Sequence, residues 1–180
     1  MGNFHNLVIN RRSIRKYKEA EISAESVKTI LETALISPTS KNKMPWEFVV
    51  VEDKDVLSEL SKCKDFGAKG FETCPLAIVV VADPDKTDTW VEDASIASIL
   101  IQMQAEDCGL GSCWIQIKGR YREDGPPAEE YVRNLLDIPE SMRVLCDITL
   151  GYKDVVRKPY DLEKCKWEKV HIGKWKTAEE

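Results

Sequence analysis

The sequence predicts an α+β fold, arranged as a sandwich of helices packed on a sheet. Short β-branched apolar runs alternate with longer segments of helical periodicity, and the N-terminal part lacks the regular strand–helix–strand rhythm of a parallel α/β protein. The 180 residues contain no internal repeat, low-complexity tract or Gly/Ser linker. We therefore expect one domain spanning residues 1–180, long enough to bury about 70% of its unfolded surface.

The first half of the chain is expected to supply two helices and two central strands. A helix is predicted over residues 24–36, because Ser23 can cap its start, Pro38 follows its end and apolar residues recur at helical spacing. Residues 46–51 (WEFVVV) and 76–82 (LAIVVVA) are short apolar runs bounded by proline and aspartate, as buried strands are. Between the two strands, a second helix is indicated by Val56, Leu57, Leu60 and Cys63.

The second half begins with the most apolar long segment, about residues 90–108, which should form a helix that ends at Gly109 and Gly111. Its apolar residues lie around the whole circumference, so we expect it to be buried on several sides. Three further elements are predicted, namely a strand at 113–117, a helix at 128–136 and a strand at 144–150. Residues 152–180 form a C-terminal arm that is too apolar for a free extension, so it should pack on something, and a partner subunit is one candidate.

Composition excludes several classes of protein. The chain has 26 basic and 31 acidic residues, a net charge of −5, and its Lys and Arg are scattered, so nucleic-acid binding is not expected. No apolar run approaches the ~20 residues needed to cross a bilayer, and the start lacks the apolar core of a secretion signal, which favours a cytoplasmic protein without membrane association. The six cysteines form no C-x-x-C pair, so we expect reduced, mostly buried thiols instead of a zinc site or disulfides.

Several standard catalytic motifs are missing. The sequence has no G-x-x-x-x-G-K-[ST], no H-E-x-x-H and no G-x-S-x-G. Gly109 and Gly111 follow a predicted helix instead of a strand and do not complete a dinucleotide-binding fingerprint. With only two histidines, a Cys/His or Ser/His nucleophile has little to work with.

A basic cluster near the start is a candidate phosphate site. Arg11, Arg12 and Arg15 place three guanidiniums within five residues, with the Ser13 hydroxyl between them. Arginine offers a planar fork of donors to phosphate, and charge-assisted hydrogen bonds are the strong ones. The alternative is a solvated basic stretch at a helix end.

A polar loop starts at Ser37 and continues through Pro38, Thr39, Ser40, Lys41, Asn42, Lys43, Met44 and Pro45 to Trp46, and it separates the predicted helix at 24–36 from the strand that starts at Trp46. Loops held between rigid elements often carry ligand contacts, and this loop offers hydroxyl and amide groups. An ordinary helix-terminating loop, in which Ser and Thr bond to the local backbone, is the other interpretation.

Together these segments resemble the nitroreductase family of flavoproteins. The resemblance rests on the R-R-S-x-R motif at 11–15 and on a loop that leads through Pro45 and Trp46 into a central strand. It continues through Cys108–Gly111, the strand at Cys113–Ile115 and Leu150–Gly151–Tyr152, and so covers nearly the whole chain. The sequence departs from the family pattern at Met44, where Gln is usual, and at the bulky Lys41.

The resemblance implies a three-layer sandwich with a central mixed sheet flanked by helices, forming an intertwined homodimer with a non-covalent FMN in each of two interface pockets. Residues 11–15 would hold the FMN phosphate and ribityl oxygens, with Arg157 or Lys158 as a further phosphate partner. The loop residues Pro38, Thr39, Ser40 and Asn42 would lie near the flavin ring or ribityl chain. Its other side would be lined by Trp114, Ile115 and Gln116.

The implied activity is transfer of hydride from NAD(P)H through flavin to nitroaromatic or quinone acceptors by a ping-pong cycle. The cofactor performs the chemistry, so no catalytic side chain and no metal are needed. Two alternatives stay open. The chain could be a non-enzymatic flavin-binding or regulatory module, or an oxygen-using member of the same family.

Overall fold

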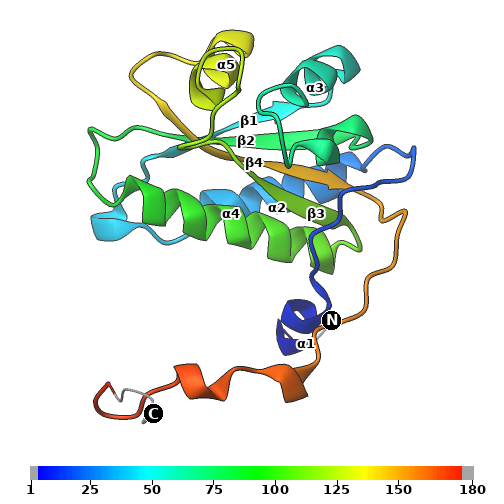
Figure 1. Cartoon of the computed structure of the whole chain (residues 1–180), viewed down its shortest axis with the longest axis vertical. Helices are drawn as coiled ribbons and strands as arrows, with labels where there is room; N and C mark the ends of the chain where they lie inside the picture. The colour runs from blue at the N-terminus through cyan, green and yellow to red at the C-terminus, as the bar shows by residue number, and fades with distance from the viewer. Residues whose placement is uncertain (1–3, 176–180) are drawn as a thin grey trace.

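The computed structural model describes residues 4–175 and contains one four-stranded sheet with helices on both faces (Figure 1). The strands, in the spatial order β1-β2-β4-β3, are β1 (Trp46–Val51), β2 (Leu76–Ala82), β4 (Arg143–Gly151) and β3 (Gly111–Gln116). The helices are α1 (Phe4–Asn10), α2 (Ala24–Leu35), α3 (Lys54–Leu60), α4 (Trp90–Asp107) and α5 (Ala128–Leu135). The fold is therefore α+β, as the sequence predicts.

The sheet is antiparallel, which corrects the mixed sheet that the resemblance implied. All three neighbouring pairs, β1–β2, β2–β4 and β3–β4, run antiparallel. Within residues 4–175, parallel pairing is confined to one isolated bridge between Ser13 and Ser112. Every residue of β2 is buried because helices cover both faces, so its continuous apolar run reflects burial and not parallel pairing.

Two apolar clusters make the three layers. On one face, α2 and α4 pack against Ile78, Val80 and Ile148 of the central strands. On the other face, α3 and α5 pack against Val79 and Ile115. Figure 1 shows α2 and α4 on one side of the sheet and α3 and α5 on the other.

The predicted elements are confirmed with shifts of one to a few residues at their ends. Ser23 caps α2 by accepting a hydrogen bond from the Ser26 N–H at 3.2 Å. The short helix α1 was missed, because the sequence shows only a brief amphipathic segment there, and none of its residues is buried. Free cysteines, four of them buried, agree with the expected reduced thiols.

The helix α4 is covered on only part of its circumference. Its inward residues are buried, but Ile96 and Ile99 remain 38% and 42% exposed. The burial of α4 on several sides that the sequence predicts is therefore present, but one apolar strip around Ile96 and Ile99 remains uncovered in the single chain.

The C-terminal segment after Tyr152 runs away from the sheet and lies beside α1 (Figure 1). The Tyr160 N–H donates to the Ile9 carbonyl at 3.0 Å. Beyond this contact, Trp167 and Trp175 are about three-quarters or more exposed. In the part of the chain that the structure describes, no helix is long and apolar enough to span a bilayer.

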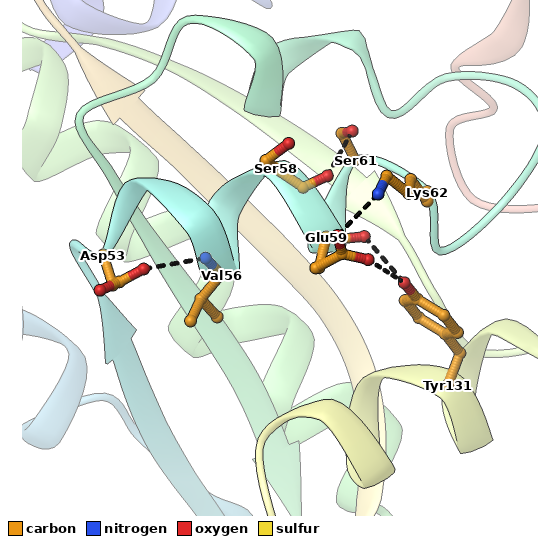
Figure 2. A network of polar contacts seen from close by, with 7 residues as sticks. All are labelled: Asp53, Val56, Ser58, Glu59, Ser61, Lys62 and Tyr131. Carbon is orange, nitrogen blue, oxygen red and sulfur yellow. Dashed lines mark hydrogen bonds and ion pairs between the residues drawn. The ribbon is translucent and has the colours of Figure 1, made fainter.

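A polar network ties α3 to α5 (Figure 2). The Tyr131 hydroxyl lies 3.1 Å from Glu59 Oε2 and 3.2 Å from the Glu59 carbonyl, and donates to Glu59. Lys62 Nζ donates to Glu59 Oε1 at 2.6 Å, and Asp53 caps the start of α3. The network fixes the end of α3, from which the chain continues to Lys64.

Candidate functional site

The basic segment 11–15 is fixed along the first residues of β3. The Ile14 N–H donates to the Ser112 carbonyl at 2.9 Å, and Ser13 bridges Ser112. The Ile14 side chain is buried, and a Cβ added to Gly111 would lie only 2.9 Å from it. Glycine at 111 therefore permits this close approach, which holds the flanking arginines at the edge of the sheet.

Arg11 and Arg15 are joined there by a third cation, Lys64. Burial raises the pKa of the Cys113 thiol, while nearby Arg15, Lys64 and Arg11 oppose that shift, so all three cations act on one thiol. Among residues 4–175, no ion pair joins Arg11 or Arg15 to a carboxylate. The result is a cluster of positive charge whose two arginines have no carboxylate partner among the described residues, which suits an anionic ligand.

Sequence reasoning missed Lys64, which lies in no motif. Its Nζ donates to the Gln116 carbonyl at 2.7 Å, so it reaches across the edge of β3. Half-burial lowers the pKa of this amine. This contact forms because the segment after α3 folds over β3. The residues around Lys64 form no pattern from which the contact could be predicted.

Arg12 lies apart from Arg11 and Arg15 in its contacts. Its guanidinium donates to the Lys158 carbonyl and lies 4.5 Å from the centroid of the Tyr160 ring. The structure therefore brings Arg12 and Lys158 together, but through the Lys158 backbone. The Arg157 and Lys158 side chains are exposed.

The polar loop forms the second part of the predicted site, at the N-terminal end of α4. Pro38 and Thr39 lead into a 3₁₀ turn, Ser40–Asn42. The Ser40 N–H donates to Asp93 Oδ1 at 2.9 Å, and the Met44 N–H donates to Thr39 Oγ1 at 3.1 Å. Asp93, in the first turn of α4, is a buried residue that the sequence analysis did not single out.

Two buried polar atoms flank this loop without a hydrogen-bond partner. They are Ser37 Oγ, at the start of the loop, and Trp46 Nε1, at its end. Buried polar groups in folded proteins nearly always have a partner, so an unsatisfied pair at one loop marks a place where a ligand or water is expected.

The third predicted group divides between the two faces of the sheet. Trp114 and Gln116 lie on the α4 side, where Trp114 Nε1 donates to Gln116 Oε1 at 2.9 Å. Ile115 lies on the opposite face, fully buried against α3 and α5. Because strand side chains alternate, the Ile115 side chain does not share a surface with its two neighbours, and only its backbone lies at the edge.

One chain does not bring the two main parts of the site together. The loop meets α4 at Asp93, whereas the basic segment lies near the other end, where Lys153 Nζ pairs with Glu106 Oε1 at 2.6 Å beside Gly111. At ~1.5 Å per residue, the stretch of α4 from Asp93 to Glu106 spans roughly 20 Å. Figure 1 shows the 36–45 loop and the 11–17 segment at opposite ends of α4.

A buried carboxyl lies on the interior strand β4, beside the edge strand β3 and near Lys64 of the basic cluster. Asp147 on β4 is paired across the sheet with Ile115 and Val79, and both its carboxyl oxygens lack a hydrogen-bond partner. Burial raises its pKa to about 8, against the opposing effect of nearby Lys64. It was not identified from the sequence, because an isolated Asp inside an apolar strand carries no motif.

Comparison with known proteins gives concordant matches. A model described as the nitroreductase family matches residues 8–65 and 58–152. A relative named "Putative NADH dehydrogenase/NAD(P)H nitroreductase" from Archaeoglobus fulgidus is 34% identical, over 94% of this chain and 97% of the relative. An FMN-dependent nitroreductase from Clostridium difficile R20291 has a similar structure, with a TM-score of 0.92 and 44% identity over 94% of this chain and 98% of that one. A structure from Parabacteroides distasonis, at 28% identity over 97% of this chain and all of that one, has a TM-score of 0.86.

Proposed function

The chain belongs to the nitroreductase family, and from this premise we propose that it is an FMN-dependent oxidoreductase that passes hydride from NAD(P)H to nitroaromatic or quinone acceptors. The observation that carries the proposal is the cluster of Arg11, Arg15 and Lys64 at a segment fixed to β3, in which neither arginine forms an ion pair among the described residues. Such a cluster matches the phosphate of a nucleotide-like cofactor.

The residues present fit a non-covalent FMN. Arg11, Ser13 and Arg15 would hold its phosphate end, while the loop from Pro38 to Asn42 would contact the flavin. The unsatisfied Ser37 Oγ and Trp46 Nε1 beside that loop provide polar atoms that a bound group could satisfy. When bound, flavin supplies the ability to accept and release a hydride, so the chain needs no acid–base dyad of its own.

We also propose that the site is completed by a second copy of the chain. The basic segment and the loop lie at opposite ends of α4, so one FMN could touch both only if they come from different subunits. A two-fold homodimer would pair the segment of each chain with the loop of its partner and so form two equivalent sites. The exposed Ile96 and Ile99 of α4, together with the apolar C-terminal arm, offer surface for such an interface.

The position of Arg12 agrees with a role for the arm. Its guanidinium contacts the Lys158 carbonyl and the Tyr160 ring, so it joins the basic segment to the start of the arm. Arg12 would then orient the arm, and Arg11 and Arg15 would bear most of the phosphate binding. Cutting the chain after Tyr160 should weaken the dimer and, with it, FMN binding.

FMN titration tests the cofactor proposal. The apoprotein should bind FMN and gain thermal stability, and Arg15→Ala should weaken binding by about 1.5–3 kcal/mol, roughly ten- to a hundredfold, because one charge-assisted contact is lost. Lys28→Ala, which removes an exposed charge from α2, is the matched control and should bind FMN as the wild type does. A wild-type protein that gains neither flavin absorbance nor stability would contradict the proposal.

Kinetics test the reaction. Residues 4–175 are built around one sheet and contain no separate domain for a nicotinamide, so donor and acceptor should take turns in one pocket and give parallel double-reciprocal lines. Intersecting lines would show that both bind together. If neither NADH nor NADPH bleaches the bound flavin anaerobically, the non-enzymatic alternative is favoured, whereas strict dependence of product on O₂ would favour the oxygen-using alternative.

A further inference from the structure

We propose that Asp93 is a positioning residue that holds the 38–44 loop in the conformation that receives flavin. The inference rests on the proposed function for its purpose, but its structural basis is separate. Asp93 Oδ1 accepts the Ser40 N–H at 2.9 Å, and Asp93 is only 3% exposed. It joins α4 to a loop that precedes it by about fifty residues in sequence.

The loop has a backbone that needs an external hold. Lys41, Asn42 and Met44 all adopt positive φ, at 49°, 55° and 44°. Residues other than glycine rarely adopt this left-handed region, and such strain persists only where surrounding contacts fix it. Inside the loop, the described hydrogen bonds run from the Asn42 N–H to the Thr39 carbonyl at 3.2 Å, from the Lys43 N–H to the Ser40 carbonyl at 3.0 Å and from the Met44 N–H to Thr39 Oγ1 at 3.1 Å. All three join loop residues to one another, so they do not attach the loop to the rest of the fold.

The Asp93 side chain makes its hydrogen bond to the loop and not to a core residue. Asp93 is as buried as the apolar core residues, yet the contacts of its carboxyl oxygens are polar, from the Ser40 N–H and the Thr89 hydroxyl. Its second oxygen receives only a long contact of 3.4 Å from Thr89 Oγ1. The first turn of α4 favours a negative charge, so a buried carboxylate is tolerated here and its strongest acceptor faces the loop.

Three variants separate the loss of the Asp93–Ser40 hydrogen bond, which we call the anchor, from general effects of a mutation on stability or charge. Asp93→Ala removes the acceptor, whereas Asp93→Asn keeps an Oδ1 that can still accept the Ser40 N–H. Glu92→Ala removes an exposed charge from the neighbouring position of α4 and is the matched control. A fourth variant, Ser40→Pro, removes the donor; Thr39 has φ −136° and ψ 157°, which a following proline accepts.

Limited trypsin digestion of the apoprotein reads out the loop without flavin. Lys41 and Lys43 are exposed trypsin sites within it. Asp93→Ala and Ser40→Pro should be cleaved there about tenfold faster than the wild type, with other sites unchanged. Asp93→Asn and Glu92→Ala should be cleaved at the wild-type rate.

FMN affinity provides the second readout. Asp93→Ala should bind FMN about tenfold more weakly, and Asp93→Asn should restore binding to near the wild-type value. If Asp93→Ala proves unfolded and is cleaved everywhere, Ser40→Pro decides the question. Wild-type cleavage of a folded Asp93→Ala or Ser40→Pro protein would overturn the anchor. A wild-type protein that binds no FMN would instead refute the proposed function, and the cleavage comparison would still test the anchor.

Discussion

Replacing Asp147 with asparagine should stabilise the protein, and more so as the pH rises. The Asp147 carboxyl is fully buried in β4, and neither oxygen has a hydrogen-bond partner. Desolvation raises its pKa to about 8, although the Lys64 amine nearby favours the charged form. Ionisation of this group therefore works against folding.

The direction and the size of the pH effect on the free energy of unfolding follow from the difference in the pKa of Asp147 between the folded and unfolded states. An unfolded Asp has a pKa of about 3.9, so between pH ~4 and ~8 the folded state binds more protons and its stability falls as pH rises. At ~1.4 kcal/mol per pH unit, Asp147 costs about 4 kcal/mol at pH 7 relative to its protonated form. Asparagine resembles the protonated acid but leaves an additional N–H unpaired, which costs about 1–3 kcal/mol, so the net gain at pH 7 is about 1–3 kcal/mol.

Urea unfolding of both proteins at pH 5, 7 and 8, at one fixed protein concentration, measures this difference. The free energy of unfolding of Asp147→Asn relative to the wild type should rise by about 4 kcal/mol from pH 5 to pH 8. The exposed Asp124→Asn variant controls for loss of a carboxylate and should track the wild type. Superimposable pH profiles for Asp147→Asn and the wild type would refute the reasoning.

Three further predictions concern packing, electrostatics and assembly. Gly151→Ala should lower the free energy of unfolding by about 1–3 kcal/mol, because the new Cβ would lie 2.7 Å from a proline side chain. The control Gly125→Ala meets only a flexible side chain at 3.4 Å or more and should cost far less. Equal melting temperatures for the two variants would contradict the close packing at Gly151. Lys62 and Tyr131 donate hydrogen bonds that hold the pKa of the Glu59 carboxyl below its usual value, so Tyr131→Phe should raise that pKa (Figure 2). An unchanged pKa in an NMR titration would show that the Tyr131 hydroxyl does not donate to Glu59. Ile99→Asp should convert a dimer to a monomer by light scattering, since a charge there would be buried at the proposed interface, and a dimer that persists would place the interface elsewhere.

Much of the fold could be predicted from the sequence because its signals are local. The apolar runs at 46–51 and 76–82 and the cap at Ser23 each depend on residues close together in the chain. The antiparallel pairing could not be read in this way, because an apolar run reports burial on both faces and says nothing of strand direction. The seven-residue α1 escaped notice because it buries no side chain and so shows no strong periodicity.

The candidate site was predicted in part. Residues 11–15 were found because several cations within five positions are visible in a sequence. Lys64 and Asp93 were not found, since their partners, Gln116 and Ser40, lie about fifty residues away along the chain. Strand alternation could have separated Ile115 from its neighbours, since side chains along a strand point to opposite faces. The distance between the basic segment and the loop is visible only in the folded chain. It is too large for both parts of one subunit to contact the same ligand.

Subunit complementation tests the shared site most directly. A variant lacking Arg11 and Arg15 and a variant with Asn42→Ala and Ser40→Pro should each bind FMN poorly. When equal amounts are unfolded together and refolded, mixed dimers should form one intact site from the basic segment of one chain and the loop of the other. Random pairing predicts that about a quarter of the sites regain wild-type FMN affinity. If mixing restores no high-affinity FMN binding, although mass spectrometry shows mixed dimers, the FMN site does not cross the subunit interface.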